Sequence, residues 1–64
     1  MIKDIQGIPL KKGHIVNDLF CDEIAKVIEV MKDKDKVRIQ YFGEDNFLNG
    51  EIEECDGEQI EIIN

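Results

Sequence analysis

The sequence contains no serine or threonine and only one histidine, His14. A serine or threonine nucleophile is therefore excluded. Each of the two cysteines, Cys21 and Cys55, could in principle pair with His14 as a thiolate. A catalytic thiol also needs a pocket and a third group that orients the base, and a chain this small rarely supplies them. We therefore expect no enzymatic activity and no catalytic residue.

Long apolar segments are also missing. No apolar run approaches the length of about 18–20 residues that crosses a bilayer. The first six residues, MIKDIQ, lack the continuous apolar region of a signal peptide. Both absences predict a cytoplasmic protein without a membrane contact, in which Cys21 and Cys55 stay reduced and do not form a disulfide.

The sequence shows no pattern typical of a metal or cofactor site. Its five glycines are dispersed turn residues and do not form a phosphate-binding cluster. The acids near the C-terminus lack the ligand spacing of an EF-hand loop. We therefore expect neither a metal nor a cofactor.

Basic residues are absent from the last 26 residues, which hold eight carboxylates, whereas the first 38 hold eight basic and seven acidic side chains. Such a block attracts cationic partners and repels phosphate. Adjacent strands lie about 4.8 Å apart, so acids on neighbouring strands are expected to form a compact patch without an internal counter-ion. The acidic residues expected to contact a partner are Glu51, Glu53, Glu54, Asp56, Glu58 and Glu61.

The length of 64 residues predicts one domain, 1–64, with a thin core. A chain of this size buries only about 60% of its unfolded surface, which leaves a stability of about 3–5 kcal/mol. A homodimer is a second way to enlarge such a core. The sequence leaves both a monomer and a homodimer open.

Turn residues divide the chain into segments of strand length. Residues 1–7 are expected to be an N-terminal arm or a first strand. Residues 36–42 alternate most clearly, with Val37, Ile39 and Tyr41 on one face. Residues 48–55 and 59–62 follow, and the pair Asp56-Gly57 between them is a hairpin signal. The C-terminal half is therefore predicted to be a meander of three strands.

Residues 23–31 permit two interpretations. An apolar stripe that includes Ile24, Val27 and Met31 has the spacing of an amphipathic helix. The β-branched residues of the same segment favour a strand, because their χ1 restriction lowers helix propensity. We expect an all-β fold with a strand here. The alternative is an α+β fold with a helix at about 19–31 packed on a β-meander.

Three segments follow one another in a recognisable rhythm: 9–16 (PLKKGHIV), 25–30 (AKVIEV) and 37–42 (VRIQYF). This rhythm resembles the first strands of SH3-like barrels in the broad sense, a group that includes Tudor-type and KOW-type modules, over most of residues 8–63. The resemblance implies a small five-stranded SH3-like barrel or a strongly bent antiparallel sheet.

Tudor-type modules hold methylated lysine or arginine in a cage of aromatic side chains and an acid. The resemblance implies Tyr41, Phe42, Phe47 and Asp45 as cage candidates, with Asn46 beside them. Tyr41 also shares its strand face with core residues, which favours a buried position for it. The same aromatic residues could instead line a peptide groove.

These observations favour a small, acidic, non-enzymatic binding module that docks a basic surface of another protein. In its sharpest form, the rows of carboxylates imitate the phosphates of a nucleic acid. A purely structural or oligomerising domain is one alternative. Another is a nucleic-acid-binding barrel, which the net charge of −7 disfavours. Its contacts would be Lys11, Lys12, Lys26, Lys36 and Arg38.

Period-two alternation also predicts which residues a barrel would turn inward. The predicted core is Ile15, Val16, Val27, Val30, Val37, Ile39, Tyr41, Ile52, Ile60 and Ile62.

Overall fold

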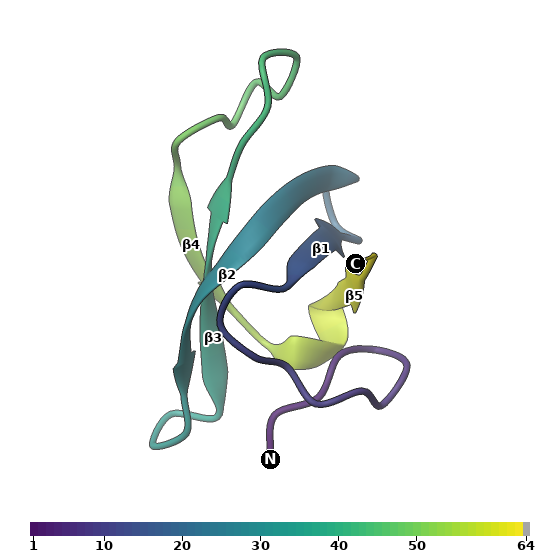
Figure 1. The fold of residues 1–64 in the computed structure, drawn as a ribbon, viewed down its shortest axis with the longest axis vertical. Helices are drawn as coiled ribbons and strands as arrows, with labels where there is room; N and C mark the ends of the chain where they lie inside the picture. Colours follow the sequence, from purple (N-terminus) through teal and green to yellow (C-terminus); the bar gives the residue numbers. More distant parts are fainter. Residues whose placement is uncertain (64) are drawn as a thin grey trace.

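Five antiparallel strands form one sheet in the computed structural model, which describes residues 1–63 (Figure 1). The strand order is β4-β3-β2-β1-β5. The expected all-β fold is confirmed. The sheet is open, with β4 and β5 at its edges, so it is a bent sheet and not a closed barrel. The elements are β1 (Ile15–Asp18), β2 (Glu23–Met31), β3 (Lys36–Tyr41), β4 (Ile52–Cys55), the 3-10 turn η1 (Gly57–Gln59) and β5 (Ile60–Ile62).

The ambiguous segment is the long strand β2, and the helix alternative is wrong. β2 pairs with β1 on one side and with β3 on the other, with a bulge between Val27 and Glu29. Its β-branched side chains suit this central position, because they pack well against neighbours on both sides of a pleated surface. Within residues 1–63, no helix has the length and apolar character needed to span a membrane.

The predicted C-terminal meander is wrong in its last connection. β4 pairs with β3 as expected, but β5 pairs with β1 and not with β4. The Asp56-Gly57 pair leads into η1 instead of a hairpin turn. This turn joins β4 to β5, the two edge strands of the sheet, and does not join two strands that pair with each other (Figure 1).

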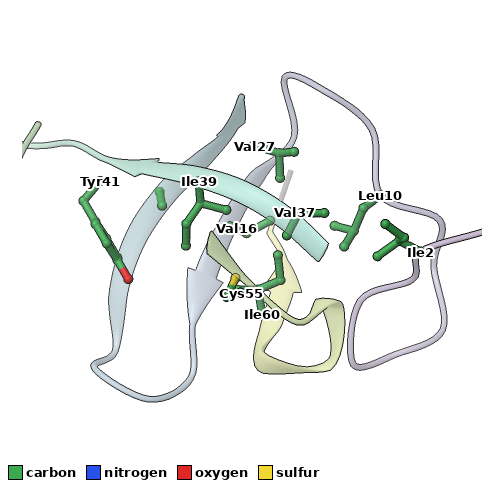
Figure 2. Close-up of a cluster of buried hydrophobic side chains, with 10 residues drawn as sticks. Ile2, Leu10, Val16, Val27, Val37, Ile39, Tyr41, Cys55 and Ile60 are labelled. Carbon is green, nitrogen blue, oxygen red and sulfur yellow. The ribbon is translucent and has the colours of Figure 1, made fainter. Parts of the chain in front are cut away.

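The core lies on the inner face of the curved sheet (Figure 2). Two predicted members, Val30 and Ile62, are only partly buried and pack against it, and Ile15 is half-buried. The predicted core residues that are fully buried are Val16, Val27, Val37, Ile39, Tyr41 and Ile60. The buried apolar residues absent from the prediction are Ile2, Leu10, Ala25, Met31 and Cys55.

Ile52 was predicted to lie in the core, and that prediction is wrong. Its side chain is 56% exposed. On β4, Cys55 pairs with Val37 and Glu53 pairs with Ile39, so both residues share the inner face. Because side chains alternate along a strand, Ile52 then lies on the outer face, opposite Gln40.

The N-terminal residues form an arm that folds back on itself, with a single bridge between Lys3 and Pro9. The backbone N–H of Leu10 donates to Ile2 O at 2.9 Å, and both side chains join one end of the core (Figure 2). The buried Asp4 fixes this arm. Its Oδ1 accepts from the N–H groups of Gln6 and Ile8, and its Oδ2 accepts from the N–H of Ile62 in β5.

Gly57 lies directly against this arm, and we expect Gly57→Ala to destabilise the fold. A Cβ at this position would lie 2.1 Å from the carbonyl oxygen of Lys3. Because that atom belongs to the backbone, the arm must move, at a cost of about 1–3 kcal/mol in the free energy of unfolding. Urea denaturation measures this change. Glu58→Ala, an exposed neighbour in the same turn, is the control, and equal stability of both variants would contradict the proposed contact.

Candidate functional site

The acidic residues of β4 do not form the uncompensated patch that the sequence predicts. β4 pairs with β3, which carries basic residues, so the two charge blocks meet across the sheet. Lys36 Nζ lies 2.7 Å from Asp56 Oδ1, and this hydrogen bond raises the pKa of the lysine. Glu54 lies 3.9 Å from Arg38 and 3.8 Å from Lys34. Glu54 and Asp56 therefore have counter-ions within the protein, and the expectation of a patch without any is wrong.

The other predicted acidic contacts lie in different surroundings. Glu61 accepts a hydrogen bond of 2.6 Å from the Gln6 side chain, and Glu53 turns toward the inner face of the sheet. Glu51 and Glu58 are exposed and form no ion pair with any residue in the described part of the chain. Because β4 and β5 do not pair with each other, the expected row of carboxylates on adjacent strands is absent from residues 1–63.

Tyr41 faces a pair of carboxylates at the edge of the core. Its hydroxyl lies 2.5 Å from Asp18 Oδ2 and 2.8 Å from Glu53 Oε2. Burial, together with these two acceptors, raises the pKa of Tyr41 far above its ordinary value. The hydroxyl has one proton, so it can donate a full hydrogen bond to only one of the two carboxylates at a time. Tyr41 is thus a buried structural residue, although its aromatic character suggested a ligand cage.

Asp18 is a buried structural residue that the sequence did not reveal. It is buried at the end of β1, and its Oδ1 accepts from the Phe20 N–H at 3.0 Å and from Gln59 Nε2 at 3.4 Å. An aspartate that starts a loop gives no sign that its carboxylate will be buried among partners from distant segments. Asp18 holds together the β1–β2 loop, Tyr41 and η1.

Asn46, predicted to lie beside a cage, is also buried and structural. Its side-chain amide donates to the carbonyl oxygens of Ile24 and Phe42, each at 3.0 Å, and its Oδ1 accepts from the Leu48 N–H. These bonds tie the β3–β4 loop to the start of β2. The loop leaves β3 through Gly43, whose φ of +116° lies in the region that favours glycine.

A groove of about 310 Å³ lies between this loop and the start of β2. Ile24 and Phe42 supply its apolar surface, and each side chain is partly exposed. No lysine or arginine lines it. We call it the Phe42 groove, and its acidic residues are Asp22, Glu23, Glu44 and Asp45.

One of the residues that line this groove, Glu23, has a buried carboxylate oxygen. Glu23 Oε2 is buried and has no hydrogen-bond partner among the described residues. A buried acceptor without a partner costs free energy that a donor would recover. The sequence predicts Phe42, Asp45 and Asn46 as members of one site. It does not indicate Asp22 or Glu23, because only the pairing of β2 with β3 brings these two residues near Phe42.

Phe47 is the most exposed aromatic residue of the β3–β4 loop, at 79%. It does not line the Phe42 groove. The cage candidates therefore occupy three different environments. Tyr41 is buried, Phe42 lines a groove and Phe47 projects from the loop.

The two thiols are free and protonated at neutral pH. Burial raises the pKa of Cys55 to about 12, and the nearby carboxylates add to the effect. Burial also raises the pKa of Cys21. His14 accepts a hydrogen bond from the Lys11 N–H at its Nδ1. In residues 1–63, no three side chains of histidine, cysteine, aspartate or glutamate come close enough to hold a metal ion.

Some basic residues of the nucleic-acid alternative form ion pairs within the protein, and the others are exposed. Lys36 and Arg38 are engaged in ion pairs with Asp56 and Glu29. Lys11, Lys12 and Lys26 are exposed. The pairs on β3 leave fewer cations to meet a phosphate backbone than the sequence count suggests.

Comparison of the chain with models of known protein families, with curated proteins and with solved structures gives no match.

Proposed function

We propose that this protein is a small, non-enzymatic binding module that docks a cationic segment of another protein in the Phe42 groove. One observation carries the proposal: four acidic residues and, among the described residues, no lysine or arginine line a partly apolar groove. Lysine and arginine have apolar stems and charged ends. Ile24 and Phe42 suit the stem, and the surrounding acids suit the charge.

The electrostatics of the whole chain favour the same class of partner. A net charge of −7 accelerates association with a basic protein and opposes contact with phosphate. The phosphate-mimic form of the hypothesis has less support, because Glu54 and Asp56 already have cations beside them.

The resemblance to SH3-like barrels stays part of the proposal, and five short antiparallel strands in one bent sheet are compatible with it. We also propose a cytoplasmic location, in which the free thiols of Cys21 and Cys55 remain reduced.

The test is a titration with an amidated peptide of five lysines. We expect neutralisation of three groove acids to raise the Kd of this peptide about tenfold, because each lost charge contact weakens binding by a fraction of a kcal/mol to about 1 kcal/mol. The salt dependence of binding should also flatten. Calorimetry at several salt concentrations measures both quantities. The groove variant carries Asp22→Asn, Glu44→Gln and Asp45→Asn.

A second triple variant provides the matched control. It also removes two aspartates and one glutamate, and Asp35 has a φ of +56°, close to the +57° of Asp22. We expect its Kd to stay within about threefold of the parent, since its charges lie outside the groove. Equal weakening in both triple variants would show that only net charge matters, and the proposal would fail. The control variant carries Asp33→Asn, Asp35→Asn and Glu51→Gln.

A further inference from the structure

A second groove, of about 400 Å³, lies where the N-terminal arm and the β1–β2 loop meet η1. Its apolar side chains are Ile5, Leu19 and Phe20, and Phe20 is 85% exposed. Exposed apolar residues that cluster in this way typically mark an interaction surface. We call it the Phe20 groove, and its polar lining residues are Asp56, Glu58 and Gln59.

The backbone around this groove is held in place by hydrogen bonds to neighbouring segments. The N–H of Leu19 donates to Gln59 O, and the N–H of Ile5 donates to Ile60 O, each at 3.0 Å. Buried Asp18 accepts from both the Phe20 N–H and the Gln59 side chain. A surface fixed in this way loses little conformational entropy when a partner binds.

Charge determines which occupant fits. Glu58 forms no ion pair with the described residues, whereas Asp56, on the same rim, is already paired with Lys36. Among the described residues, no lysine or arginine lines the groove. A second copy of the chain would bring two such acidic rims together, and each copy carries a net charge of −7. An apolar side chain with a cation next to it satisfies both the apolar surface and the acidic rim.

We propose that the Phe20 groove is a second docking surface, which takes an apolar side chain flanked by lysine or arginine on a segment of a partner protein. This site shares no residue with the Phe42 groove, so the two proposals can fail separately. A partner that engages both grooves would bind more tightly than either contact allows alone.

The probe is an amidated peptide with two central leucines between two pairs of lysines, followed by ¹⁵N NMR of the full chain. We expect the peptide to shift the backbone amide signals of Leu19, Phe20 and Gln59. Phe20→Ser should raise its Kd at least about tenfold, because burial of a phenylalanine side chain contributes that much or more. Phe47→Ser, which removes an equally exposed phenylalanine from another loop, should leave the Kd within about twofold.

Two further peptides make the chemistry falsifiable. Replacing the leucines by serines, or the lysines by glutamates, should abolish the shifts at Leu19 and Phe20. The proposal is overturned if the glutamate peptide binds as tightly, or if Phe47→Ser weakens binding as much as Phe20→Ser. It is equally overturned if sedimentation velocity shows a dimer of the parent that Phe20→Ser dissociates, because a second copy would then be the occupant.

Discussion

Replacement of Ile39 by aspartate is expected to leave the chain unfolded at room temperature. Ile39 is fully buried at the centre of β3, between β2 and β4. An unpaired carboxylate there costs several kcal/mol, which equals or exceeds the stability of about 3–5 kcal/mol expected for a domain of this size. Circular dichroism and the dispersion of the amide NMR signals measure the outcome. Val37→Asp, on the same face of the strand, should have the same effect.

Ile52→Asp is the matched control, since it makes the same chemical change on the neighbouring strand. Ile52 is more than half exposed on the outer face, so we expect a loss of less than about 1 kcal/mol. Comparison of the two variants tests the register of β4. Unfolding of both would mean that Ile52 lies inside, as the alternation of the sequence had indicated.

The second large effect is expected at Asp4, whose carboxylate accepts three backbone N–H groups. Asp4→Ala removes all three acceptor contacts and should cost about 3 kcal/mol, because hydrogen bonds to a charged group are worth about 1.5–3 kcal/mol and partly buried donors are left without a partner. Asp4→Asn retains an oxygen for Gln6 and Ile8 but presents an amide to the N–H of Ile62. Its loss should therefore lie between zero and that of Asp4→Ala, as urea denaturation at neutral pH can show.

The same carboxylate makes stability depend on acid. Burial alone would raise the pKa of Asp4, but the N–H groups of Ile62, Ile8 and Gln6 together hold it below its ordinary value. A carboxyl whose folded pKa is depressed stabilises the fold fully above its unfolded pKa of about 3.9, and this contribution is lost as the pH falls through the folded value. Below about pH 4, the parent should therefore lose this part of its free energy of unfolding as the pH falls, whereas Asp4→Ala, which has no such carboxylate, should not. If the two stability curves stay parallel there, Asp4 does not contribute as described.

The sequence predicts β3 and its buried face well, because Val37, Ile39 and Tyr41 alternate with polar residues and only their face can join the core. It fails for Ile52, since either face of a strand can in principle be the buried one. The choice between them depends on Cys55, whose burial follows from its pairing with Val37. The pairing of Cys55 with Val37 therefore shows which face of β4 is buried, and the alternation of the sequence alone does not.

The candidate sites show the same limit. Phe42 and Asp45 lie only three positions apart in the chain, and the sequence could place them in one site. Asp22 and Glu23 join them through the pairing of β2 with β3, and Phe20 meets Ile5 and Gln59 only because η1 crosses the end of the sheet. The prediction of an acidic patch without counter-ions is wrong for the same reason. The acidic and basic residues are separate in the sequence, but the antiparallel pairing of β3 with β4 brings them together.

The pairing of β1 with β5 has a consequence for how the chain acquires its structure. β2 and β3 are joined by a short turn, so they can pair locally, whereas the second edge of β1 pairs only with the distant segment Ile60–Ile62. Asp4 likewise waits for the N–H of Ile62, a partner 58 positions away. Pairing over such a distance closes a long loop and slows folding. Until Ile60–Ile62 are in place, β1 therefore keeps one edge open, and Asp4 lacks one of its three N–H donors.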